Sequence, residues 1–289
     1  MLKEWPLVAF TIAGQMAVGV FLLACIPQLM FAGPPGNAAA HGMRLVVLAI
    51  VFALMVLATA FSFFHLHHPF RARRVLANFR TSWLSREIFF EIGFMALVAL
   101  AVLLVWTGSA RGALLKGVLA AAGLAGILFL LSMSRLYMLE TLPFWNQAYT
   151  PLSFFLTSLS LGGLAAALVL GAGERRPSQA GLFTFLSFIL VAGDIAVAFF
   201  IAPGRGVYGH RPGPSLRPPA EAHRAIHLAT LALLLAALVL TGAALMAGIS
   251  RSVPGSGWNG LLAIALALVL AGQVTGRFLF YGLLTRPGR

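Results

Sequence analysis

Long apolar runs separated by short polar breaks dominate the chain. Each run exceeds the length of about 20 mostly apolar residues that a membrane-spanning helix needs. The eight runs cover residues 6–32, 43–65, 87–107, 113–134, 151–172, 180–202, 224–249 and 258–283. Turn-forming residues mark the breaks, as in Gly33–Gly36 and Pro254–Gly257. The pattern predicts an all-α polytopic membrane protein with eight transmembrane helices.

The two halves of the sequence end in a similar short pattern. The fourth run ends in Arg135-Leu-Tyr137, and the eighth ends in Arg277-Phe-Leu-Phe-Tyr281. Four helices separate these segments, so both fall on the same membrane face. We therefore expect a single integral membrane domain over residues 1–289, built from halves of roughly 1–148 and 149–289.

Two connections differ from the short turns. Residues 67–86 alternate arginines with apolar side chains, a basic amphipathic pattern that suits a segment lying along the membrane interface. Residues 203–223 form a Pro- and Arg-rich stretch, and its prolines exclude a regular helix. We expect this stretch to be either a surface loop or an arm that faces a partner.

Composition supports the membrane assignment and limits the partners. The chain is 60% hydrophobic and 9% charged, with a mean hydropathy of +0.95, a balance foreign to soluble globular domains. The net charge is +13, and the arginines lie near the ends of the runs. There they either meet lipid headgroups and set the topology, or they dock an acidic partner. No soluble basic domain exists, so nucleic-acid binding is not expected.

The basic residues also predict an orientation. Of the 20 Lys and Arg residues, 14 fall on the face that holds both termini and 6 on the other. The positive-inside rule then places both termini on the cytoplasmic side of the membrane, which we expect to be a bacterial inner membrane.

Cysteine and histidine usage argues against bound metals. Cys25 is the only cysteine, and an iron–sulfur cluster takes four protein ligands. The seven histidines lie in loops or at the ends of runs, whereas a membrane haem with two histidine ligands needs them deep in paired helices. His223 and His227 could instead chelate a metal with the histidines near His65. We expect no haem, no iron–sulfur cluster and no metal in this protein.

The few carboxylates stand out, because the chain has only 7 Asp and Glu residues. Ionisable groups in apolar segments often mark proton or redox pathways. Glu87 and Glu91 open the third run at a spacing that stacks them on one helix face, while His65 ends the second run, followed by His67 and His68. Oxidation of a hydroquinone releases two protons, which an imidazole and then a carboxylate can accept. The alternative is that these groups merely lie at the membrane interface.

Other polar residues extend the candidate site. Asp194, inside the sixth run, is protonated, paired or part of a proton route. Gln15 and Gln273 are expected to hold helices together. Residues on the face that carries His65 and Glu87 are either interfacial anchors or parts of a shared pocket. The candidates for binding quinol there are Arg71, Arg86, Glu91, Arg135, Tyr137, Arg277 and Tyr281.

A family resemblance rests on short motifs spread along the sequence. They are Glu4-Trp5-Pro6-Leu7, Gly14-Gln15, His65-Leu66, Pro69, Arg71-Ala72, Leu84-Ser85, Glu87-Ile88, Arg135, Tyr137, Thr141, Pro143, Trp145, Thr150-Pro151, Phe154-Phe155-Leu156-Thr157, Ala271-Gly272, Gly276-Arg277 and Phe280-Tyr281-Gly282. In this order and spacing the protein resembles the membrane anchor subunit of dimethyl sulfoxide reductase.

The resemblance implies an eight-helix subunit without haem that oxidises membrane quinol, either menaquinol or ubiquinol. It implies an iron–sulfur partner that receives the electrons and a molybdopterin catalytic subunit beyond it. His65 and Glu87 match the family's quinol-site residues. Two departures are His67-His68, where the family more often has glycine and a variable residue, and the 203–219 loop.

Two other functions fit the same features. Related anchors resemble the quinone-reducing subunits of sulfite-oxidising complexes, in which electrons run the other way. A proton-coupled secondary transporter would use Asp194 and the His/Glu cluster as coupling sites. Paired Gly/Pro breaks in the middle of helices in both halves would favour transport, and the sequence shows no convincing pair.

Overall fold

The fold is described from a computed structural model. It describes residues 4–27, 38–65, 78–108, 112–140, 145–172, 177–200, 221–250 and 255–282. Every regular element within these ranges is a helix.

The described helices follow the predicted runs. They are α1 (Trp5–Val20), the π-helical η2 (Phe21–Cys25), α3 (Ala38–His65), α5 (Trp83–Trp106), α6 (Ala113–Tyr137), α7 (Tyr149–Ala172), α8 (Pro177–Phe200), α9 (Glu221–Ser250) and α10 (Gly255–Gly282). With α1 and η2 counted as one, eight of the described helices are long and apolar enough to cross a membrane. The predicted all-α fold with eight spans is confirmed.

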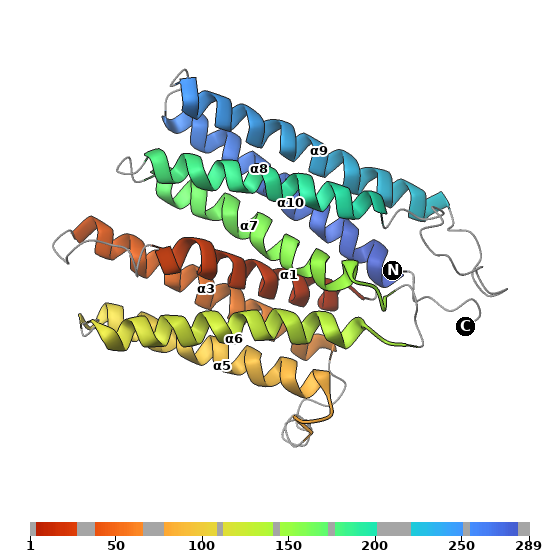
Figure 1. Ribbon diagram of the computed structural model, residues 1–289, viewed down its shortest axis with the longest axis horizontal. Coiled ribbons are helices and arrows are strands. Elements are labelled where there is room, and N and C mark those ends of the chain that lie inside the picture. Colours follow the sequence, from red (N-terminus) through yellow and green to blue (C-terminus); the bar gives the residue numbers. More distant parts are fainter. Residues whose placement is uncertain are drawn as a thin grey trace.

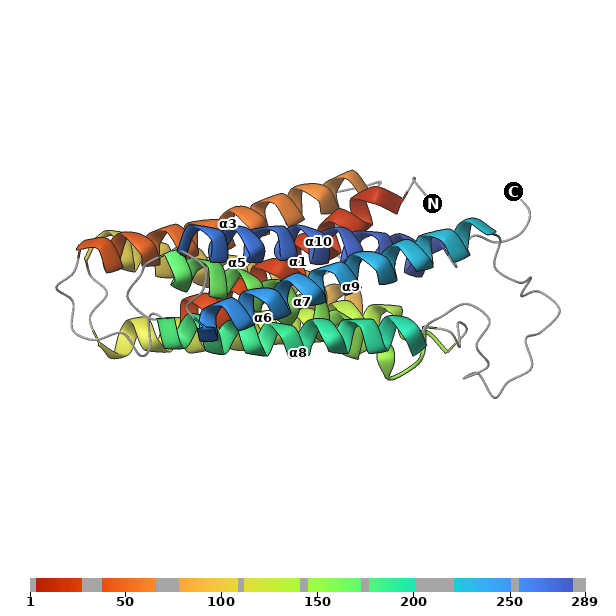
Figure 2. The same ribbon diagram turned by 90° about the horizontal axis from the view of Figure 1, so that it is seen from above.

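The helices lie side by side along the long axis of the molecule (Figure 1, Figure 2). In sequence order, α1 contacts α3, α3 contacts α5, and α5 contacts α6; the later helices contact one another as α7–α8, α8–α9, α9–α10 and α10–α7. The start of α1 and the end of α10 lie at the same end of the bundle (Figure 1). The division into halves near residue 148 stays a prediction.

Helices α1 and α7 occupy the middle of the bundle. Of their apolar spans, 67% and 61% of residues are buried, against 28% for α3, α5, α8, α9 and α10. Gly19 on α1 and Gly162 on α7 allow this packing, because a Cβ at Gly19 would collide with the Ser158 carbonyl and a Cβ at Gly162 with the backbone of Gly19. Small residues at such crossings let helix backbones approach closely.

Most helices begin a few residues before the apolar runs that predict them. Helix α3 begins at Ala38, α5 at Trp83 and α9 at Glu221, each a few residues before its predicted start. For α5 the reason is local, because Ser82 accepts a hydrogen bond from the Ser85 amide and caps the helix. The last residues of the expected interfacial segment 67–86 are thus part of α5, and the last residues of the expected loop 203–223 are part of α9. Residues 66–77 and 201–220 lie outside the described residues.

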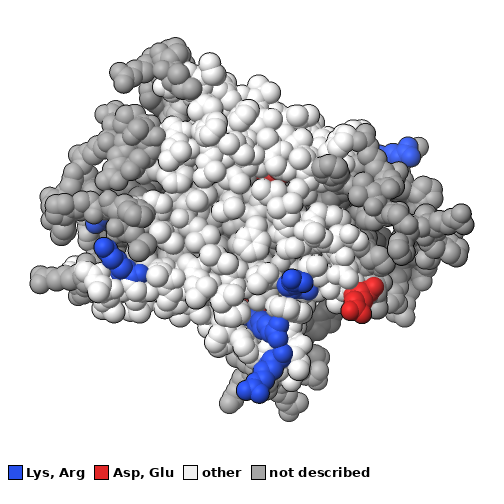
Figure 3. All heavy atoms as spheres, in the orientation of Figure 1, with Lys and Arg blue, Asp and Glu red and all other residues white. Residues whose placement is uncertain are grey.

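The surface fits a lipid environment. Figure 3 shows a broad face whose middle carries almost no charged side chain, with Lys and Arg toward its margins. Large apolar side chains are exposed along the spans, as at Leu103 on α5 and Val239 on α9. In water such a surface would aggregate, whereas in a bilayer it is the contact with lipid.

Candidate functional site

Helix α5 turns its two carboxylates into the protein. Glu87 and Glu91 are 2% and 5% exposed, and the buried positions continue through Phe94, Val98 and Ala101. This spacing of three and four residues is one face of a helix. The face that packs inward therefore carries both carboxylates at the end where α5 begins.

Glu87 has an unused hydrogen-bonding atom. Its Oε1 is fully buried and has no hydrogen-bond partner among the described residues. The carboxyl group lies within electrostatic range of Tyr137 and Tyr281. A buried polar oxygen without a partner is costly, so this position favours a bound group that supplies the missing donor.

Glu91, one turn further along α5, is held differently. Thr59 Oγ1 of α3 lies 2.8 Å from Glu91 Oε1 and 2.9 Å from the Met55 carbonyl oxygen. A threonine hydroxyl has only one proton to donate. Both contacts are satisfied together when Glu91 carries a proton and donates it to Thr59, while Thr59 donates to Met55. The arrangement can therefore hold a proton on Glu91.

The Thr59–Glu91 contact also fixes how far along the bundle axis His65 lies relative to Glu87. His65 is the last residue of α3, six residues beyond Thr59, or about 9 Å along a helix. Glu87 is four residues before Glu91, or about 6 Å along the antiparallel α5. The backbone positions of His65 and Glu87 therefore differ by only about 3 Å along the bundle axis. The side chain of His65 lies outside the described residues.

Arg277 on α10 is buried where three helices meet. It is 4% exposed, alone among the described Lys and Arg residues in being buried. Its Nη2 donates to Gln15 Oε1 of α1 at 3.1 Å, and its Cζ lies 3.7 Å from the ring centroid of Phe154 on α7. Hydrogen bonding and cation–π contact together compensate part of the desolvation of the guanidinium.

Aromatic rings surround Arg277 and reach toward Glu87. Tyr137, at the end of α6, lies 5.4 Å from both Trp145 and Tyr281, measured between ring centroids. Trp145 stacks on Phe280 at 4.9 Å, and its Nε1 donates to the Phe280 carbonyl at 3.3 Å. The Tyr281 hydroxyl donates to Thr11 Oγ1 of α1 at 3.5 Å. Tyr137 and Tyr281 thus lie within electrostatic range of both Arg277 and Glu87.

Other predicted site residues lie elsewhere. Arg135 is exposed in the last turn of α6. Arg86 turns back to its own connection, donating through Nε to the Phe79 carbonyl at 3.0 Å and lying 4.3 Å from the ring centroid of Trp83. Arg71, His67 and His68, and the side chain of His223, lie outside the described residues.

Asp194 belongs to a second polar group, in the later helices. It is 6% exposed on α8 and lies beside Ser160 of α7 and Gln273 of α10. Gln273 Oε1 accepts from Thr157 Oγ1 at 2.8 Å, so the predicted role of Gln273 in holding helices together is met by this contact. Gln15 has the same role through Arg277.

Sequence reasoning missed several contributors to both groups. Thr59 gives no signal, because threonine is common in membrane helices and usually bonds to its own backbone, as both Thr59 and Thr157 also do here. Thr157, Phe154 and Phe280 lie in motifs of the family resemblance, but nothing in those motifs assigns them a contact with the buried charges. Only the packing of α7 against α10 shows that these rings enclose Arg277.

Comparison with known proteins places this protein in a family. The family of the DMSO reductase anchor subunit (DmsC) matches residues 1–283. The chain belongs to this family. Its relatives include the anaerobic dimethyl sulfoxide reductase chain YnfH of Escherichia coli K12, which is 32% identical over 284 residues, covering 97% of this chain and 94% of the relative.

Two further relatives agree over nearly the whole length. The C subunit of anaerobic dimethyl sulfoxide reductase from Escherichia coli K12 is 30% identical over 296 residues, covering 97% of this protein and 94% of the relative. Its counterpart from Haemophilus influenzae is 30% identical over 284 residues, covering 98% and 95%. The protein is thus a multi-pass membrane anchor of a DMSO reductase-type complex, with catalytic and electron-transfer subunits as its partners.

Proposed function

We propose that this anchor subunit oxidises membrane quinol at the end of the bundle where α3 ends and α5 begins. The observation that carries the proposal is the buried Glu87 Oε1, which has no hydrogen-bond partner among the described residues. A quinol hydroxyl is a donor that would satisfy it. Lipid-soluble quinol reaches such a site from the bilayer, where the spans are exposed.

The reaction is the loss of two electrons and two protons from the quinol, which leaves quinone. We assign His65 and Glu87 to the two quinol hydroxyls, because their helix positions share a level. Glu91 takes the proton onward from Glu87 once it has released the proton that its contact with Thr59 can hold. Tyr137, Arg277 and Tyr281 close the opposite side of the site, where a guanidinium and phenols can bind the quinol oxygens.

The electrons leave to a partner. A protein with Cys25 as its only cysteine cannot supply the ligands of an iron–sulfur cluster, so the acceptor is a cluster in an iron–sulfur subunit. That subunit feeds a molybdopterin catalytic subunit. The relatives are named as reductases, and a terminal reductase consumes electrons, which favours quinol oxidation over quinone reduction here. We propose no haem and no metal in the anchor itself.

Substitution of His65 tests the proposal. In the purified complex, His65→Asn should abolish turnover with quinol and leave turnover with an artificial electron donor unchanged, because the donor bypasses the anchor. His41→Asn is the matched control, since His41 is exposed near the opposite end of α3. Equal loss of both activities in His65→Asn would make this histidine structural and contradict the assignment.

A further inference from the structure

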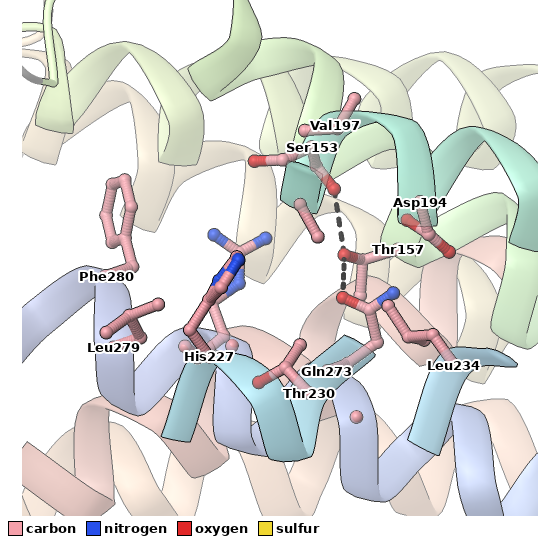
Figure 4. A pocket seen from close by; sticks show the side chains of 14 residues that line it. Ser153, Thr157, Asp194, Val197, His227, Thr230, Leu234, Gln273, Leu279 and Phe280 are labelled. Atoms are coloured by element: carbon pink, nitrogen blue, oxygen red, sulfur yellow. Dashed lines mark hydrogen bonds between the residues drawn. The ribbon is translucent and has the colours of Figure 1, made fainter. Parts of the chain in front are cut away.

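A small polar pocket lies among the four later helices, apart from Glu87. It has a volume of about 70 Å³ and receives side chains from α7, α8, α9 and α10. Its polar lining includes Thr157, Asp194, His227, Gln273 and Arg277. In Figure 4, Asp194, Thr157 and Gln273 line one side of the pocket, and His227 lies on the other.

The pocket wall has unsatisfied polar atoms of both kinds. Asp194 Oδ2 is a buried acceptor and Gln273 Nε2 a buried donor, and neither has a hydrogen-bond partner among the described residues. Asp194 as a whole is only 6% exposed. Gln273 lies near Asp194, but these two atoms do not form a direct hydrogen bond, and leaving each of them without a partner is costly. A molecule that both accepts and donates hydrogen bonds would remove both penalties at once.

Size and charge identify that molecule as water. A water occupies about 30 Å³, so the pocket holds about two, whereas a cavity that binds benzene measures about 150 Å³. The pocket is therefore smaller than a cavity that holds an aromatic ring, which favours water. A metal cation is disfavoured by the guanidinium of Arg277 in the lining, and the described residues contain no group of three or more His, Cys, Asp or Glu that could hold one.

We propose that this pocket is a hydrated proton-binding site, in which Asp194 exchanges a proton with water held between α7, α8, α9 and α10. The titratable or charged groups that line it with Asp194 are His227 of α9 and Arg277 of α10, and α7 contributes the hydroxyls of Ser153 and Thr157. Asp194 lies six residues before the end of α8, about 9 Å from that helix end. The end of α8 faces the same end of the bundle as the start of α5.

Arg277 connects this pocket to the first site. It lines the pocket and also contacts Gln15 and Phe154, and it lies within electrostatic range of Tyr137 and Tyr281, which are themselves within range of Glu87. The protonation state of Asp194 changes the charge next to Arg277. The Asp194 pocket therefore extends the polar interior from the earlier helices into the later ones. The proposal for this pocket does not depend on whether quinol is oxidised at Glu87.

Infrared spectroscopy of the purified complex tests the proposal without reference to turnover. Across a pH series, the parent complex should show a carboxylic acid C=O band that is absent in Asp194→Asn. The band should shift on transfer to D₂O, because pocket water exchanges the proton. Identical spectra of parent and Asp194→Asn at every pH, or a band that D₂O leaves unmoved, would overturn the proposal.

Two glycine variants on α10 locate the water. Gly276 lines the pocket, and a Cβ there would meet only Thr230 Cγ2, at an ordinary 3.5 Å. Gly276→Ala should therefore fold normally, fill part of the pocket and slow the D₂O shift severalfold. Gly260→Ala, where a Cβ meets nothing within 4 Å, should exchange at the parent rate. Parent-rate exchange in Gly276→Ala would show that the proton reaches Asp194 by another route and reject the pocket.

Discussion

The two carboxylates of α5 differ although they share a helix face. Glu91 is engaged by Thr59, whereas Glu87 keeps one buried oxygen without a partner among the described residues. The first arrangement suits a group that stores a proton, and the second suits a group that meets a substrate. In the proposed function one turn of helix therefore separates two roles, with Glu87 at the substrate and Glu91 behind it.

We predict that Glu91→Gln slows quinol oxidation less than Glu87→Gln does, and that the double variant is slower than either. An amide still donates to Thr59, so the packing survives, but it cannot cycle a proton. Steady-state kinetics of the purified complex with quinol provide the measurement. Because both residues act on the same proton transfer, the rate losses of the two single variants should not simply add in the double variant. A Glu91→Gln variant slower than Glu87→Gln would reverse the assigned order.

At this scale the sequence predicts the charged residues and misses their partners. Glu87, Glu91 and Arg277 are charged residues in apolar runs. Because burying a charge is costly, such residues stand out in the sequence as candidates for a function. Thr59 and Phe154 are ordinary residues of membrane helices. Their roles depend on which helix packs against α5 and α10, and no local pattern encodes that choice.

Among the elements, the contact between α1 and α7 joins the earlier helices to the later ones. Gly19 and Gly162 bring the two backbones together where no side chain fits. The same two helices supply Gln15 and Phe154, the partners of Arg277. The spacing of α1 and α7 therefore sets the geometry of the buried cluster.

We predict that Gly19→Ala destabilises the subunit by about 1–3 kcal/mol, because overpacking a tight contact forces the backbones apart. A Cβ at Gly19 would collide with the backbone carbonyl of Ser158, which cannot rotate away. Thermal unfolding in detergent measures the effect. Gly93→Ala on α5 is the control, since a Cβ there meets nothing within 4 Å. Equal melting temperatures for the two variants would remove the α1–α7 contact from this account.

Apolar length predicts the number and order of the helices, because a span is dictated by bilayer thickness. It predicts their starts less well. Helix α5 begins at Trp83 because Ser82 caps it, and polar first turns such as Ser85-Arg86 hide this start from an apolar pattern. The early start matters for function, since it places Glu87 in the second turn of a fixed helix.

The whole molecule gathers its buried charge toward one end of an apolar bundle. Glu87 lies near the start of α5, Tyr137 ends α6 and Arg277 lies near the end of α10, and these helix ends lie at the end of the bundle where α1 begins (Figure 1). In the proposed function, electrons leave the anchor at the face where a partner subunit docks. A quinol site near one end shortens that transfer, which a site at the middle of the bilayer would lengthen.

The most direct test of the central claim compares two electron donors in one preparation of the Glu87→Gln complex. We predict that turnover with quinol falls by about 10²-fold, the scale of acid–base catalysis, with a defect that varies with pH, while turnover with an artificial donor and the yield of intact complex stay at the parent level. Glu140→Gln, an exposed carboxylate after α6, should behave like the parent. Parent-level quinol oxidation in Glu87→Gln, or a loss of assembly in place of a kinetic defect, would contradict a quinol site at this residue.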